Sequence, residues 1–363
     1  MDISAEIPVY HIFIHPMDIK ELKRDIWCDD PLPAQMKADG KRLEVDLRYR
    51  GSHIRDFKKK SYQISFYKPQ IFKGVKDIHV NAEYMDTSLL RNKLSFDFFS
   101  ELGCLAPSSR HVFLKINGKA EGVYLEIESV DENFLKKRGL PEGAIFYAVD
   151  GDANFSLVSD LDKETKKSLF LGYERKVGTE RDNFCLEQLI YRINTIPNNE
   201  FEREIVHMVN VDQYLKWMAG VIMTQNYDGF VHNYSLYKNS ETGLFEVIPW
   251  DYDATWGRDV NGKYMSASYV RIEGFNTLTA RLLYVDNFRK KYRNLLENSL
   301  KKLFTLDNLK PKIEALYNHI RPVICLDPYI KDKIDYFDRE PEFIYSFIEK
   351  RNAFIKSELG KFN

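Results

Sequence analysis

The strongest signal in this chain comes from two polar stretches, Asp228-Gly-Phe-Val-His-Asn233 and Pro249-Trp-Asp-Tyr-Asp253. Residues 214–224, before the first stretch, are apolar with helical periodicity, which predicts a buried helix that delivers Asp228 into a polar loop. Residues 234–237 and 244–248 have the pattern of two strands joined by a Gly-containing hairpin turn. The returning strand then brings Asp251 beside Asn233. The sequence therefore predicts that these polar side chains gather at one end of a hairpin.

The order and spacing of Asp228, Asn233 and Asp251 are typical of a phosphotransfer centre. Protein kinases place an Asp that accepts the proton of the substrate hydroxyl five positions before a magnesium-binding Asn, and they supply a second metal-binding Asp after a hairpin. Here Asn226-Tyr227 stands where kinases have His-Arg, and Tyr-Asp follows Asp251 in place of Phe-Gly. Any kinase with this sequence is therefore atypical. The competing interpretation is a structural turn capped by Asp and Asn side chains, because short motifs also arise by chance.

Composition argues against several classes of function. Lys plus Arg number 53 and Asp plus Glu 54, so the net charge of -1 provides no field for a nucleic acid partner. The chain begins with neither a basic segment nor a long apolar one, and no run of about 20 apolar residues suggests a membrane span. We expect a protein that stays inside the cell that makes it. The cysteines are widely spaced and are predicted to be reduced, mostly buried thiols: Cys28, Cys104, Cys185 and Cys325.

The first third of the chain predicts a strand-rich lobe. Period-two patterns and turn signals predict strands at Val9–Ile14, 43–48, 62–66, 112–116 and 122–127, with Asn117-Gly118 forming a tight turn between the last two. A polar helix is predicted from about Asp18, and a second helix at 89–102, with Asp86 as its N-cap and Gly103 at its end.

From about residue 182 the apolar residues recur at helical intervals, which predicts a mainly helical lobe apart from the hairpin that carries the polar stretches. A hydrophobic content of 44% provides for a large core, and no linker rich in Gly, Ser or Pro divides the chain. The predicted fold is therefore α+β, with residues 1–363 forming a single two-lobed unit. Its strand-rich N-terminal lobe covers about 1–150 and its helical C-terminal lobe about 151–363.

A phosphotransfer centre also needs cations for the phosphates and an apolar slot for the base. A Gly51-Ser52 loop precedes Lys60, which is the candidate for a lysine that enters a strand beside phosphate; the alternative is charge that protects an edge strand. Arg91 flanks the buried face of its predicted helix and is a second candidate for a phosphate contact. The alternative is that Arg91 is an ordinary surface arginine. Tyr147 and Trp250 are candidates for the apolar surface that holds the nucleotide base. The alternative is that both are core residues.

Several motifs, taken together and in order, are similar to one family. They are Arg50-Gly-Ser, Lys59-Lys-Ser-Tyr62, Ser88-Leu-Leu-Arg-Asn92, Asn117-Gly-Lys-Ala-Glu-Gly-Val-Tyr124, His232-Asn-Tyr-Ser-Leu-Tyr237 and Pro249-Trp-Asp-Tyr-Asp-Ala-Thr-Trp-Gly257. Over most of its length the chain closely resembles the CotH family of spore coat kinases.

The resemblance implies an atypical protein-kinase-like fold. It also implies an enzyme that uses ATP and Mg²⁺, with Mn²⁺ as a possible replacement, to phosphorylate serines of other spore coat proteins. Such an enzyme would act in the mother-cell cytoplasm during sporulation, reside afterwards in the spore coat, and be needed for coat assembly and germination.

Carried onto matching positions, the resemblance implies a role for each candidate residue. Asp228 would be the catalytic aspartate, and Asn233 and Asp251 the magnesium ligands, with Asp253 sharing a metal. The phosphate contacts would come from three cations: Arg50, Lys60 and Arg91.

Two functions from other classes remain as alternatives. One is a non-catalytic coat scaffold with a kinase-like fold, although such a scaffold would not need Asp228, Asn233 and Asp251 together. The other is a metal-dependent hydrolase of phosphate esters that uses Asp228, Asp251 and Asp253.

Overall fold

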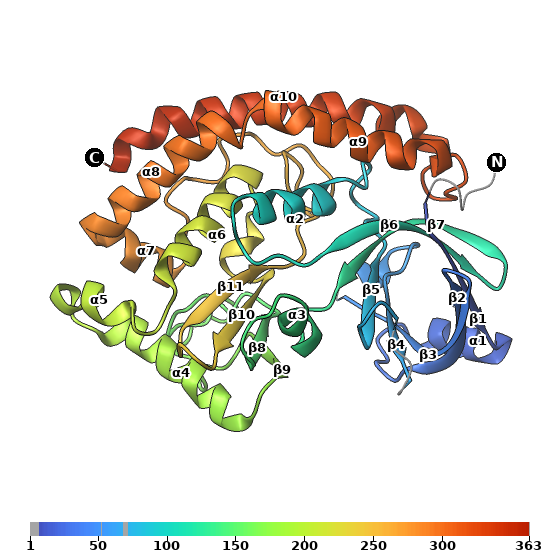
Figure 1. Cartoon of the computed structure of the whole chain (residues 1–363), viewed down its shortest axis with the longest axis horizontal. Helices are drawn as coiled ribbons and strands as arrows, with labels where there is room; N and C mark the ends of the chain where they lie inside the picture. The colour runs from blue at the N-terminus through green and yellow to red at the C-terminus, as the bar shows by residue number, and fades with distance from the viewer. Residues whose placement is uncertain (1–6, 52, 68–71, 363) are drawn as a thin grey trace.

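The computed structural model describes residues 7–51, 53–67 and 72–362. Ser52, part of the predicted phosphate-binding loop, lies outside the described residues, as do residues 1–6 at the start of the chain. The described chain has a mixed α+β fold, as predicted, with strands prominent in its first part and helices in its last. Figure 1 shows a barrel of strands at one end, a second sheet near it, and the long C-terminal helices along the top.

The barrel contains the strands of the first part of the chain in the order β1-β2-β3-β4-β5-β7-β6. Their bounds are β1 Val9–Ile14, β2 Leu32–Ala38, β3 Lys41–Tyr49, β4 Tyr62–Phe66, β5 Asp77–Asn81, β6 Ser109–Ile116 and β7 Lys119–Glu128. Neighbouring strands are antiparallel except β1 and β6, whose parallel pairing closes the barrel. Asn117 and Gly118 both have positive φ, 47° and 79°, so the predicted tight turn between β6 and β7 is confirmed.

The second sheet has the order β11-β10-β8-β9, with every pair antiparallel. Its strands are β8 Gly143–Ala148, β9 Tyr173–Val177, β10 Tyr234–Asn239 and β11 Phe245–Pro249. The predicted hairpin is confirmed as β10 and β11, in which Tyr234 pairs with Pro249. The sheet includes β8, which the predicted lobe boundary near residue 150 assigns to the strand-rich lobe.

Helices connect strands of both sheets and form most of the last third of the chain (Figure 1). They are α1 Pro16–Arg24, α2 Arg91–Glu101, α3 Glu132–Lys137, α4 Glu180–Thr195, α5 Asn198–Ile205, α6 Val211–Thr224, α7 Thr277–Tyr284, α8 Asp286–Lys302, α9 Leu306–Ile324 and α10 Ile334–Glu358. Helix α6 is buried along nearly its whole length, as its apolar run predicts. Its residues meet α2, α8, α10 and β11, so α6 lies at the centre of the helical part.

The start of α2 differs in detail from the prediction. Leu90 is its N-cap, and Asp86 lies one turn earlier. The Asp86 carboxylate still accepts the backbone N–H of Arg91, at 2.9 Å, and that of Ser88. Asp86 therefore satisfies an orphan donor at the helix start, as a capping residue does, from outside the cap position.

The predictions about membrane spans and about the cysteines can each be compared with the structure. Among the described residues, no helix is both long and apolar enough to span a membrane. The four cysteines are free thiols, as predicted, but Cys28 and Cys325 are exposed, so the prediction that most are buried is only partly right.

A buried ion pair ties the barrel to the connection between α9 and α10. The Lys59 ammonium lies 3.0 Å from Oδ2 of Asp327, and the two side chains are 1% and 0% exposed. Lys59 also donates to the carbonyl of Val123, and the N–H of Val123 donates to the same Asp327 oxygen at 2.8 Å. A Cβ at Gly122 would fall 2.1 Å from this carboxylate, so the close approach of β7 requires a glycine there.

We expect Lys59→Met to lower the free energy of unfolding by about 3–5 kcal/mol, because it leaves the Asp327 carboxylate buried without its partner. Urea denaturation followed by tryptophan fluorescence measures the change. Lys58→Met is the matched control, since Lys58 is exposed, and should cost less than about 0.5 kcal/mol. Equal unfolding midpoints for the two variants would contradict this role of the ion pair.

Candidate active site

A cavity of about 510 Å³ lies where the outer face of the barrel meets the second sheet. Side chains alternate across a strand, so the residues of β3, β4 and β5 that point away from the barrel core face this cavity. They include Arg48, Gln63, His79 and Asn81, and two residues on the same side lie just outside the strands, Arg50 after β3 and Ser61 before β4. Their neighbours fill the barrel instead: Leu47, Tyr49, Tyr62, Ile64, Ile78 and Val80. The barrel thus contributes a polar, partly cationic wall.

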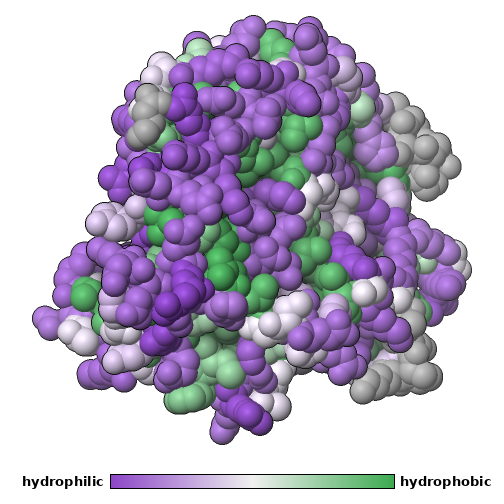
Figure 2. All heavy atoms as spheres, turned by 60° about the vertical axis from the view of Figure 1, so that its left-hand side comes forward, coloured by the Kyte–Doolittle hydropathy of each residue, from purple (hydrophilic) through white to green (hydrophobic). Residues whose placement is uncertain are grey.

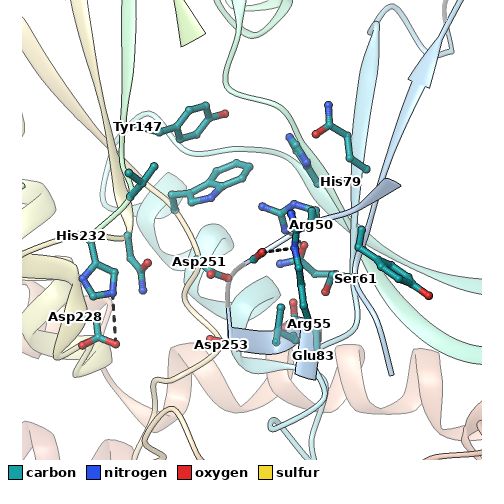
Figure 3. A pocket seen from close by; sticks show the side chains of 18 of the residues that line it. Arg50, Arg55, Ser61, His79, Glu83, Tyr147, Asp228, His232, Asp251 and Asp253 are labelled. Atoms are coloured by element: carbon teal, nitrogen blue, oxygen red, sulfur yellow. Dashed lines mark hydrogen bonds and ion pairs between the residues drawn. The ribbon is translucent and has the colours of Figure 1, made fainter. Parts of the chain in front are cut away.

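Aromatic rings line the upper part of the cavity in Figure 3. The ring of Trp250 lies 5.1 Å from that of Tyr147 and 5.4 Å from that of His79, both edge-on. The Tyr147 hydroxyl is fixed by Val130, whose N–H it accepts at 2.9 Å and to whose carbonyl it donates. Burial, followed by the positive charge of Arg50, lowers the pKa of His79 well below its usual value, so this imidazole is neutral. These rings provide the flat apolar surface that a nucleobase needs.

Arg50 connects the aromatic part of the cavity to its acidic part. Its guanidinium lies 5.6 Å from the centre of the Trp250 ring and donates a hydrogen bond to the Asn81 side chain. Burial lowers the pKa of Arg50, and the carboxylate of Asp251 opposes that effect, so the two charges face each other across the cavity (Figure 3). A cation in this position can neutralise phosphate oxygens.

The acidic side chains come from the segments that flank the β10–β11 hairpin. Asp228 begins a short 3-10 helix, Asp228–Phe230, after α6 ends at a left-handed Gln225. Asn233 and Asp251 stand on either side of the hairpin base, where the N–H of Trp250 donates to the carbonyl of Asn233 at 3.1 Å. Both have positive φ, 60° and 58°. Strained backbone of this kind clusters at functional sites, and Asn and Asp tolerate it better than most residues.

Glu83 adds a carboxylate that the sequence analysis does not identify. Its Oε1 accepts from the Asn92 amide at 3.0 Å, while Oε2 is buried without a hydrogen-bond partner among the described residues. Burial, followed by the charge of Asp253, raises the pKa of Glu83 well above its usual value. Burial and the charge of Asp251 likewise raise the pKa of Asp253 to about 8. Burial and neighbouring carboxylates therefore disfavour the charged forms of Glu83 and Asp253 at this end of the cavity.

The donor set at this end suits a hard divalent cation. Mg²⁺ prefers carboxylate and amide oxygens, and it is usually held by one or two carboxylates together with substrate phosphates. Asn233 and Asp251 supply such oxygens to the same cavity from either side of the hairpin base, and Asp253 follows Asp251 on the same segment. Within the described residues, no group of three or more His, Cys, Asp or Glu side chains is arranged to hold a metal by itself.

The structure brings most of the predicted site residues to this one cavity. Those that line it are Arg50, Tyr147, Asp228, Asn233, Trp250, Asp251 and Asp253. His232 lies beside them with its Nε2 3.8 Å from the Asp228 carboxylate. Lys60 and Arg91 do not line the cavity.

Lys60 and Arg91 make contacts elsewhere in the structure, so it does not support the phosphate contacts predicted for them. Lys60 precedes β4, and its ammonium turns back to the carbonyl of Arg55, away from the cavity. Arg91 is fully buried, where it binds the carboxylates of Asp86 and Glu340 at 2.5 Å each and the carbonyl of Thr255. The guanidinium of Arg91 thus belongs to the core and has no exposed face for a ligand.

Other residues of the cavity escape the sequence analysis. They are Arg48, Arg55, Gln63, His79, Asn81, Glu83, Glu174 and Lys176. The signal that could have identified some of them is the outward register of β3, β4 and β5, but it becomes useful only when the opposite wall is known. Two acidic residues of β7 lie elsewhere: Glu126 pairs with Arg110 and Glu128 with Arg138, and neither is among the described residues that line the cavity.

Comparison with known proteins identifies the family. The model of the CotH kinase protein family matches residues 47–355, so the chain belongs to the CotH family. It is 60% identical to the inner spore coat protein H of Bacillus subtilis strain 168 over 357 residues, 98% of this chain and 99% of that protein. It is 29% identical to an inner spore coat protein H-like protein of the same organism, covering 84% of this chain and 86% of that protein.

More distant likenesses are weaker. Spore coat protein homolog 1 of the fungus Rhizopus delemar is 23% identical, over 68% of this chain and 42% of that protein. Among solved structures, a chain of the HipA, HipB and operator DNA complex of Shewanella oneidensis MR-1 is 14% identical with a TM-score of 0.41, covering 97% of this chain and 74% of that chain. The proinflammatory kinase CtkA of Helicobacter pylori is 11% identical with a TM-score of 0.33, covering 82% and 93%. These TM-scores are too low to support a shared fold.

The raised pKa of Asp253 predicts a stability effect that depends on pH. The folded-state pKa of about 8 lies above the ordinary value of 3.8, so the stabilisation that the protonated group contributes is complete below about pH 4 and is lost as the pH rises through 8. We therefore expect Asp253→Asn, measured in EDTA, to raise the melting temperature more at pH 9 than at pH 6. A difference between variant and parent that is the same at both pH values would disprove the raised pKa.

Proposed function

We propose that this chain is an atypical protein kinase that transfers the γ-phosphate of ATP to serine hydroxyls of spore coat proteins. The observation that carries the proposal is the convergence of Asp228, Asn233 and Asp251 on one cavity that also has a cation and an aromatic wall. Family membership supports the same activity class. Residues 1–363 act as a single unit, because the cavity needs side chains from both the barrel and the helical part.

The chain's own residues position and deprotonate the acceptor. Asp228 accepts the proton of the serine hydroxyl while the serine oxygen forms a bond to the γ-phosphorus. The bond between that phosphorus and the β–γ bridging oxygen breaks, and ADP leaves with the electron pair. Arg50 neutralises charge on the phosphates, and Tyr147 and Trp250 hold the base, so the reacting atoms are kept in line.

Asn233 and Asp251 would hold Mg²⁺, with Asp253 on the same segment sharing the metal, and Mn²⁺ suits the same oxygen ligands. The ion, when bound, supplies positive charge to the β- and γ-phosphate oxygens. The neighbouring carboxylates at this end of the cavity support such a role, since a divalent cation would relieve their mutual repulsion.

The relatives support a biological setting for the proposed activity. A protein that is 60% identical over nearly the whole chain is an inner spore coat protein of Bacillus subtilis. We place this chain in the mother-cell cytoplasm during sporulation and then in the spore coat. Its acceptors are other coat proteins, and its activity serves coat assembly and germination.

The first test compares Asp228→Asn with Asp251→Ala in the transfer of label from γ-labelled ATP to a serine-rich coat protein extract. We expect Asp228→Asn to lower the transfer rate by about 10²–10⁴-fold while keeping Mg²⁺-dependent stabilisation by ATP. Asp251→Ala should lose both, because it removes a metal ligand. Asp212→Asn, on an exposed aspartate of α6, is the control and should behave like the parent.

Other outcomes of this experiment identify the alternatives. Transfer that survives both substitutions would contradict the site assignment. Release of free phosphate without labelled protein would support the hydrolase, and intact ATP would support the scaffold.

The role of Arg50 has its own test. Arg50→Gln should weaken ATP binding roughly tenfold to a hundredfold, since a charge-assisted hydrogen bond to phosphate is lost. Lys60→Gln is the matched control and should bind ATP like the parent, because Lys60 faces away from the cavity. Isothermal titration calorimetry with a non-hydrolysable ATP analogue and Mg²⁺ measures the affinity of each variant. The reverse pattern would restore Lys60 as the phosphate contact.

A further inference from the structure

Asn92, near the start of α2, connects two segments that carry carboxylates into the cavity. Its side-chain oxygen accepts the backbone N–H of Tyr252 at 3.0 Å, and its side-chain NH2 group donates to Oε1 of Glu83 at 3.0 Å. Because a backbone N–H can only donate, the bond to Tyr252 fixes the orientation of the amide. One side chain thus joins Glu83 to the segment Asp251–Asp253. Asn92 itself is not among the described residues that line the cavity.

The two segments belong to different walls of the cavity. Glu83 lies two residues after β5 of the barrel, and Asp251 lies two residues after β11 of the second sheet. Both residues have positive φ, 48° and 58°, so the chain turns sharply where each wall ends. The Asn92 amide bridges these two turns. It therefore helps to set the spacing between the walls at the acidic end of the cavity.

Helix α2 also holds the side chain of Tyr252. Asn92, Phe96 and Phe99 recur at intervals of four and three residues, which places them on one face of the helix. The fully buried ring of Tyr252 lies 6.4 Å from that of Phe96 and 5.0 Å, edge-on, from that of Phe99. Backbone and ring of Tyr252 are thus both fixed by α2. The positions of Asp251 and Asp253, its neighbours in the chain, depend on the same helix face.

An uncharged amide suits this place. Hydrophilic side chains cover most of the face of the molecule in Figure 2, whereas Asn92 is in the interior and 0% exposed. A buried amide needs hydrogen-bond partners, and Asn92 has one at each end. A lysine here would pair with the carboxylates, and an aspartate would repel them. The amide instead holds Glu83 by one oxygen, while Oε2 has no hydrogen-bond partner among the described residues.

We propose that Asn92 is a positioning residue for the divalent cation. By holding Tyr252 and Glu83 in place, it fixes the segment that carries Asp251 and so raises the affinity of the site for the metal ion. Asn92 does not line the cavity, so it acts through these two neighbours. The inference rests on the proposed kinase function and adds to it the residue that orders the metal-binding segment.

Binding of Mn²⁺ tests the proposal without any catalysis, because Mn²⁺ suits the same oxygen ligands and the free ion has an EPR signal. Titrations with a non-hydrolysable ATP analogue compare the parent, Asn92→Ala and the double variant Asn92→Asp with Glu83→Gln. Asn92→Ala removes both hydrogen bonds. In the double variant the new Gln amide donates to the new Asp carboxylate, which still accepts from Tyr252. Both bonds are then restored, with donor and acceptor exchanged between residues 83 and 92.

Asn352→Ala is the matched control. The side-chain amide of Asn352 on α10 donates to the carbonyls of Leu300 and Phe304, so this variant also removes two hydrogen bonds made by a helical asparagine. Asn352 is not among the described residues that line the cavity. We expect Asn352→Ala to lower the melting temperature and to leave the Kd for Mn²⁺ unchanged.

We expect Asn92→Ala to raise the Kd for Mn²⁺ roughly tenfold to a hundredfold, the usual effect of losing a side chain that holds metal ligands in place. The Mg²⁺ concentration that gives half-maximal phosphate transfer should rise by a similar factor, while kcat at saturating Mg²⁺ stays within about threefold of the parent value. The double variant should bind Mn²⁺ within about threefold of the parent, because both hydrogen bonds are present.

Other results overturn the positioning role and leave the kinase function standing. They are an unchanged Kd in Asn92→Ala, an equal rise in Asn352→Ala, and a double variant that binds Mn²⁺ as weakly as Asn92→Ala. If Asn92→Ala does not fold, the double variant decides: parental affinity supports the role, and weak binding or failure to fold contradicts it. A parent chain that binds no Mn²⁺ with the analogue and labels no protein overturns the proposed function itself.

Discussion

The hydrogen bond from the N–H of Trp250 to the carbonyl of Asn233 is the contact on which the site depends. It continues the pairing of β10 and β11 by one step beyond Tyr234 and Pro249, and on either side of it the backbone turns left-handed at Asn233 and Asp251. The same step brings Trp250 against Tyr147 and opposite Arg50. One backbone contact thus sets the metal ligands and the aromatic wall together. Asp228 joins them because the end of the buried helix α6 lies beside the same hairpin.

Charge is distributed differently in the core and in the cavity. In the core, Arg91 is matched by Asp86 and Glu340, and Lys59 by Asp327, so these two buried cations have opposite charges beside them. At the acidic end of the cavity, burial raises the pKa values of Asp253 and Glu83, and neighbouring carboxylates raise them further. Buried charges of one sign destabilise a fold, and perturbed carboxylates are characteristic of functional sites. Perturbed carboxylates in the cavity, beside paired charges in the core, are expected of a site that binds a metal cation and phosphates.

The sequence predicts the local part of this site well and the long-range part poorly. The hairpin, the buried helix before it and the grouping of Asp228, Asn233 and Asp251 follow from patterns within a few tens of residues. Closure of the barrel depends on pairing between β1 and β6, which are far apart in the chain. The outward register of His79 and Asn81 on β5 becomes informative only when the opposite wall of the cavity is known.

The wrong predictions have the same cause. Arg91 has the sequence character of a surface arginine, yet Glu340, 249 positions away, completes its burial. Near the irregular turn before β4, a shift of one position decides which lysine is buried, and it is Lys59 rather than Lys60. Two barrel strands, β2 and β5, are also absent from the prediction, and β8 joins a sheet whose other members lie beyond the predicted lobe boundary.

The most direct measurement is a crystal structure of the chain with Mg²⁺ and a non-hydrolysable ATP analogue. The account predicts a metal ion bound by Asn233 and Asp251, phosphates beside Arg50, the base against Tyr147 and Trp250, and the terminal phosphate facing Asp228. A nucleotide bound elsewhere, or a metal ion that contacts neither Asn233 nor Asp251, would contradict it.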